Sequence, residues 1–110
     1  MTYRGTTPKH IFYFPFKQEE VAVLKISYFQ KGQVRFTKEL SDVTFDETIN
    51  TIELNLSQED TLSFEKYSWL DRARDSLILI QIRVKLTSGQ CWVSEPMNDR
   101  LGDVLLDGVI

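Results

Sequence analysis

The sequence predicts an all-β, antiparallel fold, either a sandwich or a barrel. Apolar and polar residues alternate with a period of two along several short segments, which is typical of strands with one buried face and one exposed face. Glycine lies in two of the turns between these segments, where a tight hairpin needs a left-handed residue. Several short strands joined by turns indicate a sandwich or a barrel.

The strand segments differ in how clearly they alternate. In 77–86 the aliphatic side chains occupy one face, and Gln81, Arg83 and Lys85 occupy the other. In 10–14 both faces are apolar, so we expect this strand to lie inside the sandwich or to turn its outer face toward another subunit. The predicted strands are 10–14, 22–28, 33–40, 51–56 and 77–86.

The two glycine turns predict a register, because paired side chains in a sheet must share a face. A three-residue loop over 87–89 pairs Val84 with Trp92 and Ile82 with Ser94, and it puts Gly89 at the left-handed position. This arrangement keeps each apolar face continuous across the hairpin.

For the earlier turn we again predict a three-residue loop, over 30–32, with Gly32 left-handed. This loop pairs Tyr28 with Val34 and Ile26 with Phe36. A two-residue loop would instead place Tyr28 opposite Arg35, an apolar side chain beside a charged one, and we therefore reject it.

Two segments break the alternation. Ser57 is a good helix cap and is followed by acidic residues, so we predict one short helical turn after it, within 57–64. The stretch 65–76 has no clear period. It is either a short helix lined by Tyr67, Leu70 and Leu77, or a long loop.

Length and composition indicate one globular domain. The chain has 110 residues, 42% of them hydrophobic and 26% charged, with a net charge of −3. This balance argues against a nucleic-acid partner, and no apolar run reaches the roughly 20 residues that span a membrane. We expect a β-sandwich domain over 1–97 and a C-terminal extension over 98–110, docked on the domain or on a neighbouring subunit.

The beginning of the sequence and its cysteine content bear on the compartment. No apolar stretch follows a charged start, so no signal peptide is expected. Cys91 is the only cysteine, which precludes an internal disulfide and fits synthesis in a reducing cytoplasm. We expect the chain to remain there unless an assembly carries it out.

The sequence gives little support for catalysis. Cys91 and His10 are the only cysteine and histidine, and each is most simply a structural strand residue. One of each cannot supply the four ligands of a zinc site. Asp99, Asp103 and Asp107 recur every four residues, but Gly102 and charge repulsion oppose a helix there. We therefore expect no enzyme activity and no catalytic, cofactor-binding or metal-binding residues.

Aromatic and apolar side chains are the better candidates for partner contacts. Tyr67 and Trp69 could stack on a sugar, which makes a carbohydrate-binding module the alternative function, or Trp69 could fold back over one end of the sandwich. The expected partner-binding residues are Phe12, Phe14, Tyr67, Trp69, Val109 and Ile110.

Short motifs along nearly the whole chain resemble those of small proteins encoded among the structural genes of prophages in Gram-positive bacteria. One is the ending Leu-Leu-Asp-Gly-Val-Ile, and another is the lead-in Tyr-Arg-Gly-Thr-Thr-Pro with its Phe-Pro-Phe strand. The motifs lie at 3–8, 14–16, 30–34, 56–64, 80–84 and 105–110. This chain departs from the family in the extra length of 65–76.

The resemblance implies an antiparallel, immunoglobulin-like β-sandwich of about six or seven strands, akin to domains of siphophage tails and baseplates. It implies a structural component of a virion that acts through protein–protein contacts, without enzyme activity. The expected partners are other virion proteins, with a homo-oligomer as a reasonable form. The chain would then move from the host cytoplasm into the virion.

Overall fold

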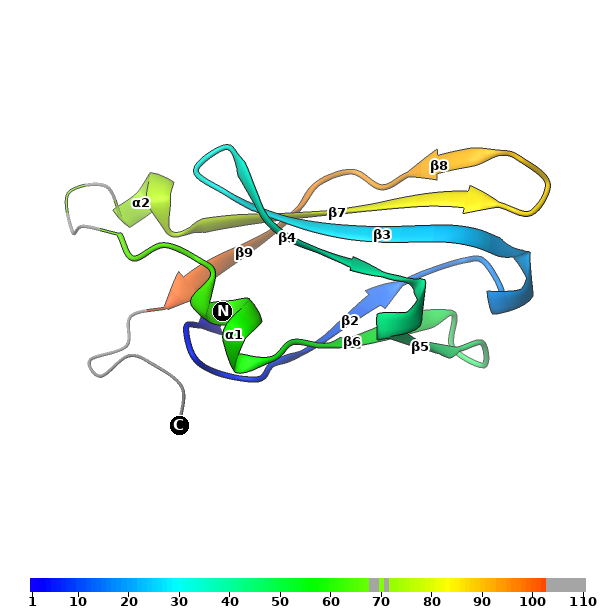
Figure 1. Cartoon of the computed structure of the whole chain (residues 1–110), viewed down its shortest axis with the longest axis horizontal. Coiled ribbons are helices and arrows are strands. Elements are labelled where there is room, and N and C mark those ends of the chain that lie inside the picture. Colours follow the sequence, from blue (N-terminus) through cyan, green and yellow to red (C-terminus); the bar gives the residue numbers. More distant parts are fainter. Residues whose placement is uncertain (68–69, 71, 103–110) are drawn as a thin grey trace.

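Two facing β-sheets make up most of the molecule, which confirms the all-β prediction (Figure 1). The computed structural model describes residues 1–67, 70 and 72–102. The strands in this part of the chain are β1 (Thr2–Tyr3), β2 (Lys9–Tyr13), β3 (Val21–Gln30), β4 (Gln33–Glu39), β5 (Val43–Asp46), β6 (Thr51–Asn55), β7 (Leu77–Leu86), β8 (Cys91–Val93) and β9 (Met97–Gly102). The helical turns are η1 (Gln18–Glu20), η2 (Leu40–Asp42), α1 (Gln58–Leu62) and α2 (Arg72–Asp75).

The larger sheet has the strand order β1-β9-β7-β3-β4, and β8 also pairs with β7. Strands β8 and β9 follow one another along the same side of β7, at Arg83–Lys85 and Leu77–Ile80 respectively. The short strand β1 pairs with β9 in parallel. The prediction of a wholly antiparallel fold is therefore wrong at this edge, because the lead-in runs beside the last described strand in the same direction.

The smaller sheet has the order β2-β6-β5 and faces the larger one, with the core between them. The predicted inner faces are confirmed, since the aliphatic side chains at alternate positions of β3, β6 and β7 are buried. The largest fully buried side chains include Tyr28, Phe14, Phe64, Leu24, Ile26, Ile52, Leu54, Ile78 and Ile82.

The β7–β8 hairpin has the predicted register. Val84 pairs with Trp92, and the backbone N–H of Ser94 donates to the carbonyl of Ile82 at 2.8 Å. Gly89 closes the three-residue loop with φ of 93°, the left-handed conformation that glycine adopts without strain.

The β3–β4 hairpin does not have the predicted register. Gln30 pairs with Gln33 across a two-residue loop, and Lys31 and Gly32 are both left-handed, with φ of 55° and 72°. A register shift then leaves Arg35 as an extra residue, so that Tyr28 pairs with Phe36 rather than with Val34. This bulge restores the common apolar face that the three-residue loop was meant to preserve.

The helical turn after Ser57 is confirmed as α1. The hydroxyl of Ser57 accepts the backbone N–H of Asp60 at 3.0 Å, and the carboxylate of Asp60 accepts the N–H of Ser57 at 2.9 Å. In the segment 65–76 a short helix does form, α2, but Leu70 is 98% exposed and so does not line an apolar face.

Residues 98–102 of the expected C-terminal extension lie in β9, within the larger sheet. Residues 103–110 lie outside the described part of the chain. Across the residues described, no helix is both long enough and apolar enough to span a membrane.

Candidate functional site

Strand β2 is an edge of the smaller sheet, and its outer backbone groups have no partner among the described residues. The N–H of Phe14 donates to Asn50, and the N–H of Leu56 donates to Pro8, so the even positions of β2 bond to β6. In an antiparallel pair the alternate positions then point away. The N–H and C=O groups of Lys9, Ile11 and Tyr13 therefore face the open edge.

The same three residues turn their side chains to the outer face of the sheet. Tyr13 is 71% exposed and Ile11 is 58% exposed, whereas Phe12 and Phe14 are buried in the core. The strand is therefore not buried on both faces within the chain, and whether its outer face meets another subunit stays a prediction. Phe12 and Phe14, two of the predicted partner-binding residues, are thus core residues, and the exposed side chains of β2 are those of Ile11 and Tyr13.

A shallow depression of about 300 Å³ runs beside this edge, between β2 and β9. Its walls include His10 and Phe12 from β2, and Met97 and Asp99 from β9. Pro8 and Pro15 flank β2 and cannot donate a backbone hydrogen bond. The open edge is therefore short and is bounded at both ends by a proline.

A polar network holds β2 against the larger sheet. His10 Nδ1 lies 2.6 Å from the hydroxyl of Tyr28, and His10 Nε2 lies 3.3 Å from the hydroxyl of Thr2. Thr2 in turn donates to a carboxylate oxygen of Asp99 at 2.6 Å. Burial lowers the pKa of His10, and the nearby charge of Asp99 offsets part of this effect. The network positions the edge strand, and the fully buried Tyr28 hydroxyl is unavailable to a substrate.

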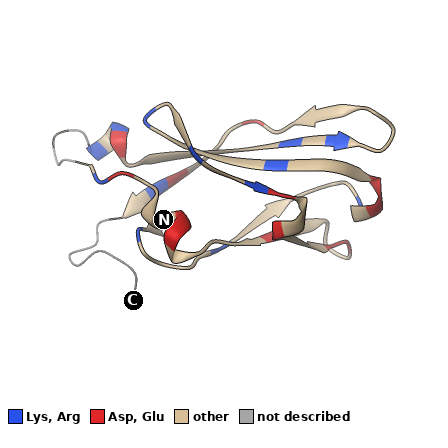
Figure 2. Ribbon diagram, viewed as in Figure 1, with Lys and Arg blue, Asp and Glu red and all other residues tan. Residues whose placement is uncertain are grey.

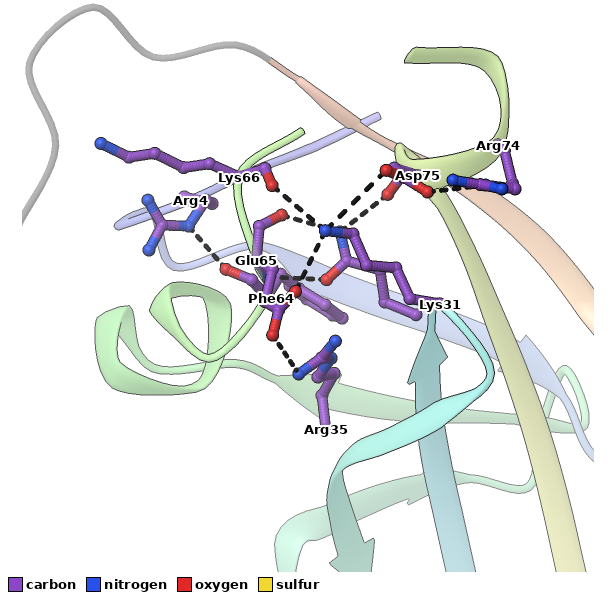
Figure 3. Close-up of polar contacts among 9 residues, drawn as sticks. Arg4, Lys31, Arg35, Phe64, Glu65, Lys66, Arg74 and Asp75 are labelled. Atoms are coloured by element: carbon purple, nitrogen blue, oxygen red, sulfur yellow. Dashed lines mark hydrogen bonds and ion pairs between the residues drawn. The ribbon is translucent and has the colours of Figure 1, made fainter. Parts of the chain in front are cut away.

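A second polar cluster lies two residues further along, at Gln30, the last residue of β3 (Figure 3). The Gln30 side chain is 1% exposed, and its Nε2 donates to the carbonyls of Glu65 and Asp75, both at 2.8 Å. Its Oε1 accepts the N–H of Glu65 at 2.7 Å. One buried amide thus fastens both ends of the 65–76 segment to β3.

Charged side chains surround this amide. Lys31 Nζ lies 3.0 Å from Glu65 and 3.9 Å from Asp75, and Arg35 lies 3.3 Å from Glu65. The hydrogen bond from Lys31 and the charge of Arg35 lower the pKa of the Glu65 carboxyl. Sequence reasoning missed this cluster. Its one signal is that Gln30, a polar residue, continues the inward series of Ile26 and Tyr28.

The remaining predicted site residues separate into two groups. Tyr67 is partly buried and packs against the core, so its ring is only partly available for stacking on a sugar. Trp69, Val109 and Ile110 lie outside the described residues. Cys91 is an exposed residue of β8, and His10 belongs to the other sheet. Within the described ranges no three His, Cys, Asp or Glu side chains are grouped to bind a metal ion.

Comparison with known protein families, curated proteins and solved structures finds no match for this chain.

Proposed function

We propose that this chain is a structural or assembly protein without enzyme activity, and that β2 pairs with an extended segment of a partner protein. The observation that carries the proposal is the edge of β2, whose outer backbone groups have no partner among the residues that the structure describes, and which exposes the side chains of Ile11 and Tyr13. An exposed edge of this kind is a template for strand addition.

The sequence resemblance supports a more specific assignment. It favours a virion component of a prophage, associated with the tail or baseplate, and an immunoglobulin-like version of the two-sheet fold. The partner that adds a strand to β2 would then be another virion protein.

Incorporation into phage particles tests this function. Particles purified after induction of the prophage are analysed by quantitative mass spectrometry for this chain, wild type or carrying Ile11→Lys and Tyr13→Lys together. We expect the wild-type chain in the particles and a severalfold loss of the double variant, because lysines on an edge strand oppose the addition of another strand.

Thr44→Lys is the matched control, since it adds a charge to the exposed face of β5 at the other edge of the same sheet. It should be incorporated like the wild type. Absence of the wild-type chain from the particles would overturn the virion assignment. Equal incorporation of the β2 double variant would overturn the role of the edge.

A further inference from the structure

A groove of about 700 Å³ crosses the outer face of the larger sheet, over β3, β7 and β8. It lies on the opposite sheet from the β2 edge, and the proposed function makes no use of it. Basic and apolar side chains line it, among them Val23, Lys25, Arg83, Lys85, Cys91 and Val93.

The basic residues of this groove lie next to one another, and no acidic side chain of the described residues forms an ion pair with them. Lys25 of β3 is paired directly with Arg83 of β7, and Lys85 follows two positions later on the same face (Figure 2). None of the three forms an ion pair within the described part of the chain. Like charges directly opposite in a sheet are destabilising. A concentration of positive charge in a chain of net charge −3 points to an acidic ligand.

The nearest acidic residue in the register does not neutralise this patch. Glu39 of β4 pairs with Lys25 on its other side. Glu39 lies at the start of η2, where its backbone N–H donates to the carboxylate of Asp42 at 2.8 Å, and within the described residues its own carboxylate forms no ion pair with Lys25. The positive face of the groove therefore stays available.

Apolar side chains flank the charges. Val93 is 55% exposed at one wall, and Val23 is 43% exposed at the other. A ligand that fits the groove must therefore combine carboxylates with aliphatic side chains.

Residues 103–110 of this chain have that composition: Asp-Val-Leu-Leu-Asp-Gly-Val-Ile. In an extended conformation Asp103 and Asp107 share a face with Leu105 and Val109, while the other face carries only apolar residues and Gly108. The acidic and apolar alternation of the first face matches the lining of the groove.

The path of the chain favours binding between copies. Strand β9 is antiparallel to β7 and ends beside Leu77, at the end of β7 remote from Lys85. Gly102, the last described residue, therefore lies at the end of the sheet remote from the groove. Residues 103–110 span at most roughly 26 Å when extended, and the path from Leu77 to Arg83 along β7 alone takes about 20 Å of that.

From these observations we infer that residues 103–110 of one copy bind the basic groove of a second copy, head to tail. The inference rests on the proposed function in taking the chain to be an assembly component, and it adds a contact through which copies join. Such a contact uses two different surfaces, so it generates a ring or an open filament rather than an isologous dimer.

Cys91 makes this contact measurable, because it is the only cysteine of the chain, is exposed, and lines the groove. Its rate of alkylation by iodoacetamide is followed in the purified chain as the concentration is raised. We expect the rate to fall by roughly tenfold as copies associate, and to recover in concentrated salt, which screens the carboxylate contacts.

Charge reversal and charge exchange identify the two surfaces. Asp103→Lys with Asp107→Lys should abolish the protection of Cys91, as should Arg83→Glu with Lys85→Glu. All four changes in one chain should restore it. Asp103→Glu with Asp107→Glu is the matched control and should keep it. Circular dichroism establishes that each variant is folded.

An alkylation rate that does not change with concentration in the wild-type chain would overturn the inference. Protection that survives reversal of both aspartates would also overturn it, since another surface would then cover the groove. These outcomes leave the virion assignment untouched. Conversely, absence of the chain from particles would not alter the solution measurement.

Discussion

The side-chain amide of Gln30 and the backbone of β2 differ in whether their polar groups have hydrogen-bond partners. Gln30 has both donors and its acceptor satisfied by the backbone of 65–76 and is almost inaccessible to water. On β2 the N–H and C=O groups at Lys9, Ile11 and Tyr13 are open, beside exposed apolar side chains. Gln30 is thus a group that contributes to stability, whereas the open edge of β2 is the surface on which the proposed strand addition depends.

Loss of the Gln30 amide should give the largest effect. We expect Gln30→Ala to lower the free energy of unfolding by about 3 kcal/mol, because two carbonyls and one N–H lose their partner in a buried site. Urea denaturation followed by circular dichroism measures this. Gln33→Ala, at the exposed partner position of the hairpin, is the control and should cost less than about 0.5 kcal/mol. A similar small loss in both variants would show that water replaces the amide.

The hydroxyl of Tyr28 should have an intermediate effect. Tyr28→Phe keeps the ring stacked on Phe36 but removes the partner of His10 Nδ1. We expect a loss of about 1 kcal/mol in the free energy of unfolding. Thermal and urea denaturation both report it. An unchanged stability would mean that the link between β2 and the larger sheet does not depend on this hydrogen bond.

The same network predicts a pH dependence. Burial holds the pKa of His10 in the folded chain below its unfolded value of about 6.5, so the unfolded chain takes up the proton first as the pH falls. The stability associated with neutral His10 is complete above pH 6.5 or so and is lost as the pH falls through that value toward the folded pKa. We expect wild type to lose more stability than His10→Gln between about pH 7.5 and 5.5. Parallel curves for the two chains would contradict this.

The charged side chains around Gln30 should matter much less than the amide. Lys31 contacts Glu65, whose side chain is half exposed, and solvent screens such pairs. We expect Lys31→Met to change the free energy of unfolding by about 0.5 kcal/mol or less. A loss of unfolding free energy comparable to that of Gln30→Ala would mean that the ion pairs, rather than the amide, stabilise this cluster.

The exposed side chains of β2 should have the smallest effect on stability. Tyr13→Ala should change the free energy of unfolding by less than about 0.5 kcal/mol, because its ring is mostly in water. Phe12→Ala, one residue earlier and inside the core, should cost about 3 kcal/mol. Equal losses would mean that Tyr13 is packed in solution and that the edge is not open.

Much of the fold could be predicted from the sequence where alternation and turn chemistry agree. The bounds of β7 and the register of its hairpin with β8 follow from the aliphatic positions of 77–86 and from Gly89. The β3–β4 hairpin could not be predicted, because a bulge at Arg35 shifts the register without a local signal for which residue is extra. Strand β1 is two residues long and exists only through its pairing with β9.

The candidate site was harder to predict for a similar reason. Apolar residues on both faces of 10–14 single out that strand in the sequence, but only the pairing with β6 shows which backbone groups are open. The role of Gln30 depends on two segments that are 35 and 45 residues away in the sequence. Hydrogen bonds between residues so far apart in the chain leave no recognisable pattern in the sequence around either residue.

Hydrogen exchange of the β2 amides in the free chain tests the open edge most directly. Measured by NMR in dilute solution, the amides of His10, Phe12 and Phe14 should exchange slowly, and those of Ile11 and Tyr13 should exchange fast. This alternation is the signature of a strand paired on one side only. Uniform slow exchange along β2 would contradict the account, because the edge would already be covered and could not accept a partner strand.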